Sequence, residues 1–221
     1  ADRVLLRDAL RGVSRDRAAA ALADVLRQEQ LDVLLVTNAR GVVLWRPGNP
    51  GRVGDSRADD PLLRAALDRR EATGATMIVP AVDLRREGPA LEARARFELV
   101  PTPRARSRPE RELSAGMLLA AAAPIVGDDG TVLGAVYGAV LLNQRHDLAD
   151  RIKQVVFEDA VYRGKSVGTS TVFLDDVRIA TNVQNADGTR AIGTRAAADV
   201  YERVVREGRP WVGRAFVVND W

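Results

Sequence analysis

The chain has 221 residues, of which 46% are hydrophobic and 29% charged, and its 33 basic and 30 acidic residues leave a formal net charge of +3. These proportions are ordinary for a globular protein, and the absence of cysteine excludes disulfides, thiolate metal sites and cysteine nucleophiles. The aromatic content of 5% argues against a nucleic-acid surface, which would combine a clustered basic face with aromatic side chains.

The first part of the chain predicts a helix followed by a hairpin. Residues 1–30 read as one long amphipathic helix, because apolar residues recur there with a period near 3.6. Two short apolar runs, 32–38 and 41–47, are joined by "NARG", which is typical of a β-hairpin. The pattern then predicts a short helix within 56–70, where aspartates precede Pro61.

A second group of strands is expected further along. "GATMIVPA" (74–81) predicts a strand, and residues 82–112 are helix-prone before they become the proline–arginine segment "PTPRARSRPERE", which we interpret as a solvated, mobile loop rather than a phosphate-binding patch. "AGMLLAAAAPIV" (115–126) and "TVLGAVYGAVLL" (131–142) predict two longer strands. The longest uncharged run, 113–127, has 15 residues, and a membrane-spanning helix needs about 20.

The remaining chain repeats much of this order. A helix is expected at 145–157, a hairpin at 168–183 around Asp175 and Asp176, a helix at 196–207 and a last strand at 210–220. The closing hairpin of the first series has no counterpart in the second.

Three segments in this order resemble the extracytoplasmic Cache sensor domains, which are PAS-like, of bacterial chemoreceptors and sensor histidine kinases. They are "VLLVTNARGVVLWRPGNPGRVGD", "AAAPIVGDDGTVLGAVYGAVLL" and "VFLDDVRIATNVQNADGTRAIGT". The resemblance implies an α+β fold with a long N-terminal helix and PAS-like antiparallel sheets. It implies a signalling helix over 1–30, a membrane-distal module over 31–150 and a second module over 151–221 that is incomplete at its C-terminus.

The resemblance also implies a role. The chain would be the periplasmic, non-enzymatic sensor domain of a methyl-accepting chemotaxis receptor, binding a small organic anion such as acetate, propionate or lactate. The alternative is the sensor domain of a histidine kinase. Flanking transmembrane helices and a cytoplasmic signalling domain would lie outside this chain, and the intact receptor could be a homodimer. No cofactor, metal or nucleic acid is expected.

Two hypotheses come from other classes. An esterase-like enzyme has little support, because the only histidine, His146, has no G-x-S-x-G elbow near it. A structural dimerisation module would present an apolar stripe without a hollow.

In the first module the candidate ligand residues are cationic or apolar. Arg46, before the "PGNP" turn, corresponds to the position where the family often holds a ligand carboxylate, and Arg57 is a second choice that Asp55, Asp59 or Asp60 could instead pair with. Alternation places Tyr137 on one strand face with Leu133, Ala135 and Ala139, where small neighbours would leave a hollow. We expect three apolar residues to line the same hollow, with plain core packing as the alternative: Met77, Met117 and Leu119.

In the second module the candidates lie at the end of a strand and in the loop that follows. Arg178, Thr181 and Asn182 form the first group, and Arg190 and Thr194 form the second. The alternative is that these residues join the loop to the sheet. The acidic pairs Asp128–Asp129 and Asp175–Asp176 are expected in hairpin turns, where aspartate accepts backbone hydrogen bonds.

Overall fold

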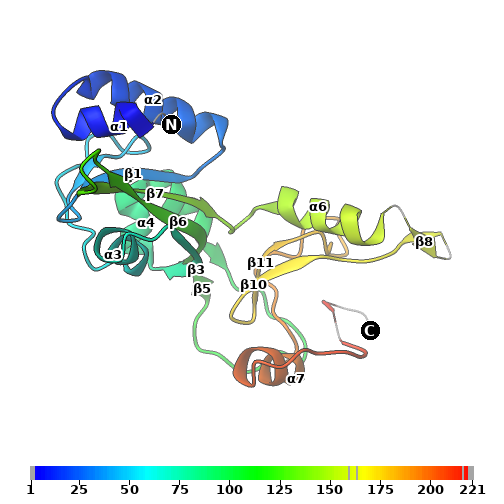
Figure 1. The fold of residues 1–221 in the computed structure, drawn as a ribbon. Coiled ribbons are helices and arrows are strands. Elements are labelled where there is room, and N and C mark those ends of the chain that lie inside the picture. Colours follow the sequence, from blue (N-terminus) through cyan, green and yellow to red (C-terminus); the bar gives the residue numbers. More distant parts are fainter. Residues whose placement is uncertain (1–2, 159, 163, 216, 219–221) are drawn as a thin grey trace. The chain divides into compact units, whose positions relative to one another are not determined.

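The computed structural model describes residues 3–158, 160–162, 164–215 and 217–218 (Figure 1). The chain divides into two compact units. Unit 1 consists of Ala1–Ala93 and Gly116–Leu141, and unit 2 consists of Arg94–Ala115 and Leu142–Trp221. The predicted module boundaries at residues 30 and 150 stay predictions about the family's modules, whereas these units describe which segments pack together.

Unit 1 is built on one five-stranded antiparallel sheet. Its strand order is β2-β1-β7-β6-β3, so the first and last hairpins of the unit lie side by side. The strands are β1 (Val33–Asn38), β2 (Val43–Trp45), β3 (Thr73–Val79), β6 (Gly116–Val126) and β7 (Val132–Leu141). The predicted α+β class with an antiparallel sheet is confirmed, and so are the hairpins at 32–47 and 115–142.

Helices cover both faces of this sheet (Figure 1). Helices α3 (Pro61–Asp68) and α4 (Ala81–Glu87) lie on one face, and α1 (Arg3–Leu10) and α2 (Arg15–Gln28) lie on the other. The register places Leu35 opposite Tyr137 and Val36 opposite Val136, so the two residues of each pair face the same side. We call the α3–α4 side, which holds Tyr137, the inner face. A further helix, α5 (Pro89–Ala95), follows α4.

The predicted single helix over 1–30 is wrong, because the chain forms two helices with a turn between them. Gly12 has a φ of 92° and Ser14 a φ of 56°, and both are left-handed conformations that end a helix. The turn is closed by the amide of Val13, which donates to the carbonyl of Asp8 at 2.8 Å. This turn lets α1 fold back on α2, so that both bury apolar side chains against Leu34, Val36 and Ile125.

In the acidic turn between β6 and β7, one aspartate accepts backbone hydrogen bonds, as predicted, and the other forms ion pairs with α1 and the turn after it. Asp129 accepts from the backbone amide and the hydroxyl of Thr131, and these hydrogen bonds lower the pKa of the Asp129 carboxyl. Asp128 forms ion pairs with Arg7 and Arg11. The turn therefore also fixes α1 to the end of the hairpin.

Gly134 of β7 lies where a side chain cannot fit. A Cβ at this position would come within 1.9 Å of the carbonyl oxygen of Thr37 on the neighbouring strand. We expect Gly134→Ala to lower the free energy of unfolding by about 1–3 kcal/mol, because the backbone of β1 must move. Gly138→Ala on the same strand is the matched control, since its nearest contact is the Leu31 side chain at 3.4 Å. If urea unfolding showed the same loss of unfolding free energy in both variants, the close approach of Gly134 to Thr37 would not be what limits this position.

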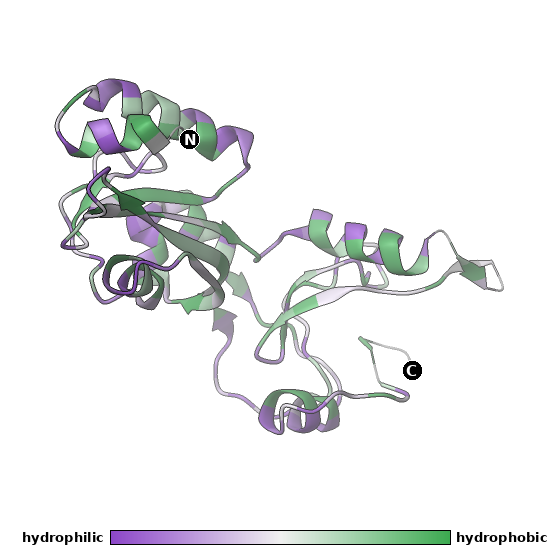
Figure 2. Cartoon of the chain, viewed as in Figure 1, coloured by the Kyte–Doolittle hydropathy of each residue, from purple (hydrophilic) through white to green (hydrophobic). Residues whose placement is uncertain are grey.

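Unit 2 contains two-stranded antiparallel sheets and a long helix. Helix α6 (His146–Phe157) contacts the hairpin of β10 (Thr171–Leu174) and β11 (Val177–Thr181), and both elements were predicted. Figure 2 shows the alternation of hydrophilic and hydrophobic residues along α6. The remaining elements are β4 (Phe97–Glu98), β5 (Glu112–Leu113), β8 (Val161–Tyr162), β9 (Lys165–Ser166), α7 (Ala198–Tyr201) and the π-helix η1 (Glu202–Arg206).

The last strand predicted at 210–220 is wrong where it can be checked. Residues 210–215 form no strand, and Phe216, Asn219 and Asp220 lie outside the described residues. In the part of the chain that the structure describes, no helix combines the length and the apolar character needed to cross a bilayer.

Candidate functional site

The inner face of unit 1 carries a cluster of ionised side chains. It lies between β2, the following loop, the start of α3 and the end of α4. We call it the inner-face cluster, and its members are Arg46, Asp55, Arg57, Asp60 and Glu87.

Arg46 is the most deeply buried member, with 1% of its side chain exposed. Its Nη1 and Nη2 donate to the two carboxylate oxygens of Asp55 at 2.8 and 2.9 Å, its Nε donates to Glu87 at 2.9 Å, and its Nη1 also donates to the carbonyl of Arg52. The hydrogen bond from Arg46 holds the pKa of the Asp55 carboxyl below its usual value. Every nitrogen of this guanidinium therefore has an internal partner.

Arg57 shares Glu87 with Arg46. Its Nη1 donates to Glu87 at 2.6 Å and its Nη2 donates to Asp60 at 3.0 Å. Asp60 also caps α3, because its other carboxylate oxygen accepts from the amides of Leu62 and Leu63. The pairing of Arg57 with an aspartate was the alternative interpretation of the sequence. The contribution of Glu87 was not anticipated, since nothing in the sequence links it to a residue 41 positions earlier.

Tyr137 lies beside this cluster and is 1% exposed. The guanidinium carbon of Arg57 is 5.7 Å from the centre of the Tyr137 ring, a cation–π distance. Burial, with the charge of Asp60 as a smaller cause, raises the pKa of the Tyr137 hydroxyl to about 12. Ala135 and Ala139 on the same face are also buried, so this part of the sheet is covered.

The structure brings together only some of the residues predicted for this site. Arg46, Arg57 and Tyr137 meet on the inner face, as expected, and Met77 faces that side because it pairs with the buried Leu118. Met117 and Leu119 do not line the same space. They alternate with Leu118 along β6 and point to the opposite face, where Leu119 is 55% exposed.

The opposite face of unit 1 has an open groove of about 1110 Å³. It is lined mainly by apolar residues of α1, α2, β6 and β7, among them Leu22, Val25, Ala123 and Gly138. None of the residues that line the groove belongs to the inner-face cluster. The predicted anion site and this groove therefore lie on different faces of the sheet.

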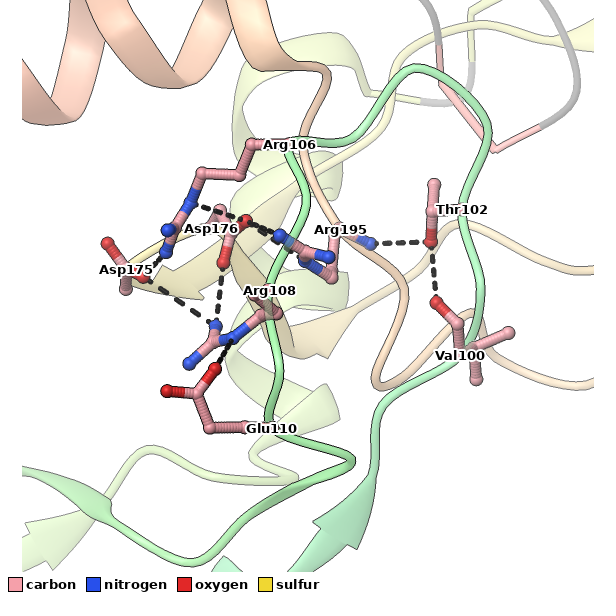
Figure 3. Close-up of polar contacts among 8 residues, drawn as sticks. All are labelled: Val100, Thr102, Arg106, Arg108, Glu110, Asp175, Asp176 and Arg195. Carbon is pink, nitrogen blue, oxygen red and sulfur yellow. Dashed lines mark hydrogen bonds and ion pairs between the residues drawn. The ribbon is translucent and has the colours of Figure 1, made fainter.

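Unit 2 contains a second ionic cluster, centred on Asp176 (Figure 3). The Asp176 side chain is fully buried and accepts from three arginines. Arg195 donates through Nε at 2.9 Å and Nη2 at 2.7 Å, Arg108 through Nη1 at 3.0 Å and Arg106 through Nε at 3.2 Å. Asp175, the residue before Asp176 in the turn, accepts a hydrogen bond from Arg106 Nη2 at 2.6 Å. We call this group the Asp176 clasp.

The clasp corrects the interpretation of 101–112 as a solvated, mobile loop. Two arginines of that loop are bound to the β10–β11 turn, and the guanidinium carbon of Arg106 lies 4.3 Å from the centre of the Tyr201 ring. The loop is held at its start as well, because the Thr102 hydroxyl accepts from the amide of Arg195 at 3.0 Å. The prolines and arginines indicated a loop correctly, but its charges are paired inside unit 2.

The candidates predicted in the second module separate into different environments. Thr181 bonds within the hairpin, to Thr171 and Ser170, and Arg190 pairs with Asp150 of α6 at 2.8–2.9 Å. Asn182 accepts from the amide of Ser170 and lines a polar hollow beside α6. Arg178 and Thr194 do meet, with Arg178 Nη1 donating to Thr194 Oγ1 at 3.0 Å. The alternative role, joining the loop to the sheet, therefore describes Arg178 with Thr194, and also Arg190, whose Nη1 donates to the carbonyl of Thr181 at 2.7 Å.

Among the described residues, no group of three or more histidine, aspartate or glutamate side chains is arranged to hold a metal ion. The only histidine, His146, has a lowered pKa because of its burial and the charge of Arg190. The inner-face cluster and the Asp176 clasp are instead built from arginine–carboxylate pairs. Such pairs bind and position charged groups.

The solved structures to which the chain is similar include three proteins of low sequence identity. The periplasmic domain of LuxQ from Vibrio cholerae is 15% identical with a TM-score of 0.41, and the match covers 84% of this chain and 65% of that one. A VqmA–ligand–DNA complex from Vibrio cholerae is 8% identical with a TM-score of 0.35, covering 62% and 59%. A sensory box sensor histidine kinase from the same organism is 12% identical with a TM-score of 0.25, covering 58% and 94%. The chain thus spans less than two thirds of the first two proteins.

Among curated proteins no match is found. The family model described as "Single cache domain 3" matches residues 140–221, which include α6, the β10–β11 hairpin and three arginines of unit 2 that are named above, Arg178, Arg190 and Arg195. Residues 140–221 are therefore similar to a Cache domain, the family that the sequence motifs resemble.

Proposed function

We propose that this chain is the periplasmic ligand-binding region of a bacterial transmembrane receptor, and that it binds a small organic anion on the inner face of unit 1. The output would be that of a methyl-accepting chemotaxis receptor, with a sensor histidine kinase as the alternative. The observation that carries the proposal is the convergence of two arginines, the buried Arg46 and the partly buried Arg57, on the single carboxylate of Glu87 beside Tyr137.

A ligand carboxylate would have to take the place of Glu87. The inner-face cluster contains two cations and three carboxylates, so it already has an excess of one negative charge. A further anion would be repelled unless an internal carboxylate left. Glu87 is the candidate to leave because it is the last residue of α4 and contacts both arginines, whereas Asp55 is held by two parallel hydrogen bonds and Asp60 also caps α3.

This exchange supplies the two states that a sensor needs. With Glu87 bound, the end of α4 is fixed to the arginines; with a ligand bound in its place, the end of α4 is released. A ligand shifts such an equilibrium only by its difference in affinity for the two states. Here the difference arises because only the released state exposes both guanidinium groups to the ligand.

The proposal is tested by thermal and urea unfolding of the whole chain with acetate, propionate or lactate at constant ionic strength. A ligand at a hundredfold its dissociation constant should stabilise the folded state by about 2.7 kcal/mol. Glu87→Gln should bind the acid several-fold more tightly, because the variant removes the internal competitor, and Tyr137→Phe should bind it more weakly. Asp83→Asn, which changes an exposed carboxylate of α4, is the matched control and should not alter the affinity.

Two results would overturn the proposal. One is that none of the acids stabilises the wild type. The other is that Glu87→Gln binds the acid no better than the wild type, since the ligand would then not compete with Glu87.

A further inference from the structure

Arg178 of β11 is buried in unit 2, and no described carboxylate serves as its counter-ion. All five residues of β11 are buried, and Arg178 is 4% exposed. Its Nη1 donates to Thr194 Oγ1, and its guanidinium carbon lies 5.0 Å from the centre of the Phe173 ring. Thr194 Oγ1 in turn donates to the carbonyl of Ala191 at 2.6 Å, so the hydroxyl is already oriented to accept from Arg178.

Other buried arginines of the chain are paired with carboxylates. Arg46 pairs with Asp55 and Glu87, and Arg195 pairs with Asp176. Within the described residues, no carboxylate pairs with Arg178, and its Nε is buried without a hydrogen-bond partner. Burial lowers the pKa of Arg178 to about 10, so the side chain is still charged at neutral pH. An unpaired buried charge is among the costliest features a protein interior can contain.

The nitrogens Nε and Nη2 of Arg178, which have no acceptor among the described residues, form one edge of the guanidinium. In other arginines of the chain the same edge binds a carboxylate. Arg85, Arg145 and Arg195 each direct Nε and Nη2 at one carboxylate, over distances of 2.6–2.9 Å. In Arg178 only Nη1 has a hydrogen bond among the described residues, so the edge formed by the buried Nε and by Nη2 has no internal acceptor. Two parallel N–H groups on one edge match the two oxygens of a carboxylate.

We infer that Arg178 is the counter-cation of a small monocarboxylate that binds in unit 2 through the Nε–Nη2 edge, with Thr194 holding the opposite side of the guanidinium. One charge is expected on the ligand, because nearby arginines of unit 2 are already neutralised, Arg190 by Asp150 and Arg195 by Asp176. This site is separate from the inner-face cluster and does not depend on it. It adds a second anion site within the segment that matches the Cache family model.

The test observes the Arg178 Nε–H group directly. Sodium acetate is titrated into the ¹⁵N-labelled whole chain at constant ionic strength kept with sodium chloride, and the Arg178 Nε resonance is assigned by its loss in Arg178→Lys. Acetate should shift this resonance saturably, and Arg178→Lys should bind acetate about tenfold or more weakly because the bidentate edge is lost. A parallel titration with sodium phosphate should give the weaker response.

Three results would overturn the inference: no saturable shift with acetate, a tighter response to phosphate, or unchanged acetate affinity in Arg178→Lys. Arg178→Met provides a second measurement. Without acetate it should be at least as stable as the wild type, because an apolar side chain replaces an unpaired charge. Glu87→Gln and Tyr137→Phe should leave the Arg178 response unchanged, so a failure of the unit 1 proposal is distinguishable from a failure of this one.

Discussion

Replacing Arg46 by methionine is expected to lower the free energy of unfolding by about 3–5 kcal/mol, the range for breaking a buried ion pair from one side. The variant removes the hydrogen bonds to Asp55, Glu87 and the Arg52 carbonyl at once. It also changes the charge of the inner-face cluster from an excess of one negative charge to an excess of two. Urea unfolding followed by tryptophan fluorescence measures the loss, since Trp45 packs in the core of unit 1.

The excess negative charge of the inner-face cluster allows a prediction for the double variant Arg46→Met with Glu87→Gln. Glu87→Gln alone should cost less than Arg46→Met, because Arg46 keeps Asp55 and Arg57 keeps Asp60. The double variant should be more stable than the sum of the two single losses indicates, since removing Glu87 relieves the repulsion created by removing Arg46. Additive losses would show that the cluster does not act as one electrostatic group.

Arg86→Met is the matched control for Arg46→Met. Arg86 pairs with Asp83 on the surface of α4, and 42% of its side chain is exposed. Exposed pairs of this kind contribute about 0.2–1 kcal/mol. If Arg46→Met lost no more than this control, the buried position of Arg46 would not matter for stability.

The strands of unit 1 could be predicted because their information is local. The alternation around Tyr137, the "NARG" turn and the Gly127–Gly130 turn each determine structure within a few residues. The turn between α1 and α2 also arises from local sequence, because it depends on Gly12. However, one glycine within a strong 3.6-residue repeat of apolar side chains is not enough to predict a turn. The period continues on both sides of the break because both helices pack on the same sheet face.

The partners of the predicted arginines could not be read from the sequence. Arg46 was selected for its position before a turn, but whether it faces a ligand or an internal acid depends on Glu87, which only the packing of α4 brings near. Arg178 is the same residue type at a similar position beside a strand. Whether an arginine has internal acceptors for all of its nitrogens, as Arg46 does, or leaves Nε without one, as Arg178 does, is a property of tertiary contacts.

Asp176→Asn is expected to destabilise unit 2 by about 3–5 kcal/mol, because the change leaves Arg195 without the buried carboxylate that it contacts through Nε and Nη2. The same change weakens the attachment of Arg106 and Arg108 to the β10–β11 turn. Limited digestion with trypsin reads out this attachment, since cleavage after an arginine needs a segment that leaves the folded surface. Cleavage within 101–112 should become faster in the variant.

Asp175→Asn is the matched control, because the neighbouring residue contacts the same loop from an exposed position. Its side chain is 36% exposed and pairs with Arg106, and its φ of 57° is one that asparagine tolerates. We expect a loss of about 1 kcal/mol or less and little change in cleavage. If both variants were cleaved equally fast, the loop would be held by Thr102 and the Tyr201 contact rather than by Asp176. A large effect of Asp176→Asn alone would establish that one buried carboxylate joins the 101–112 loop to the β10–β11 hairpin, in agreement with the assignment of Arg94–Ala115 to unit 2.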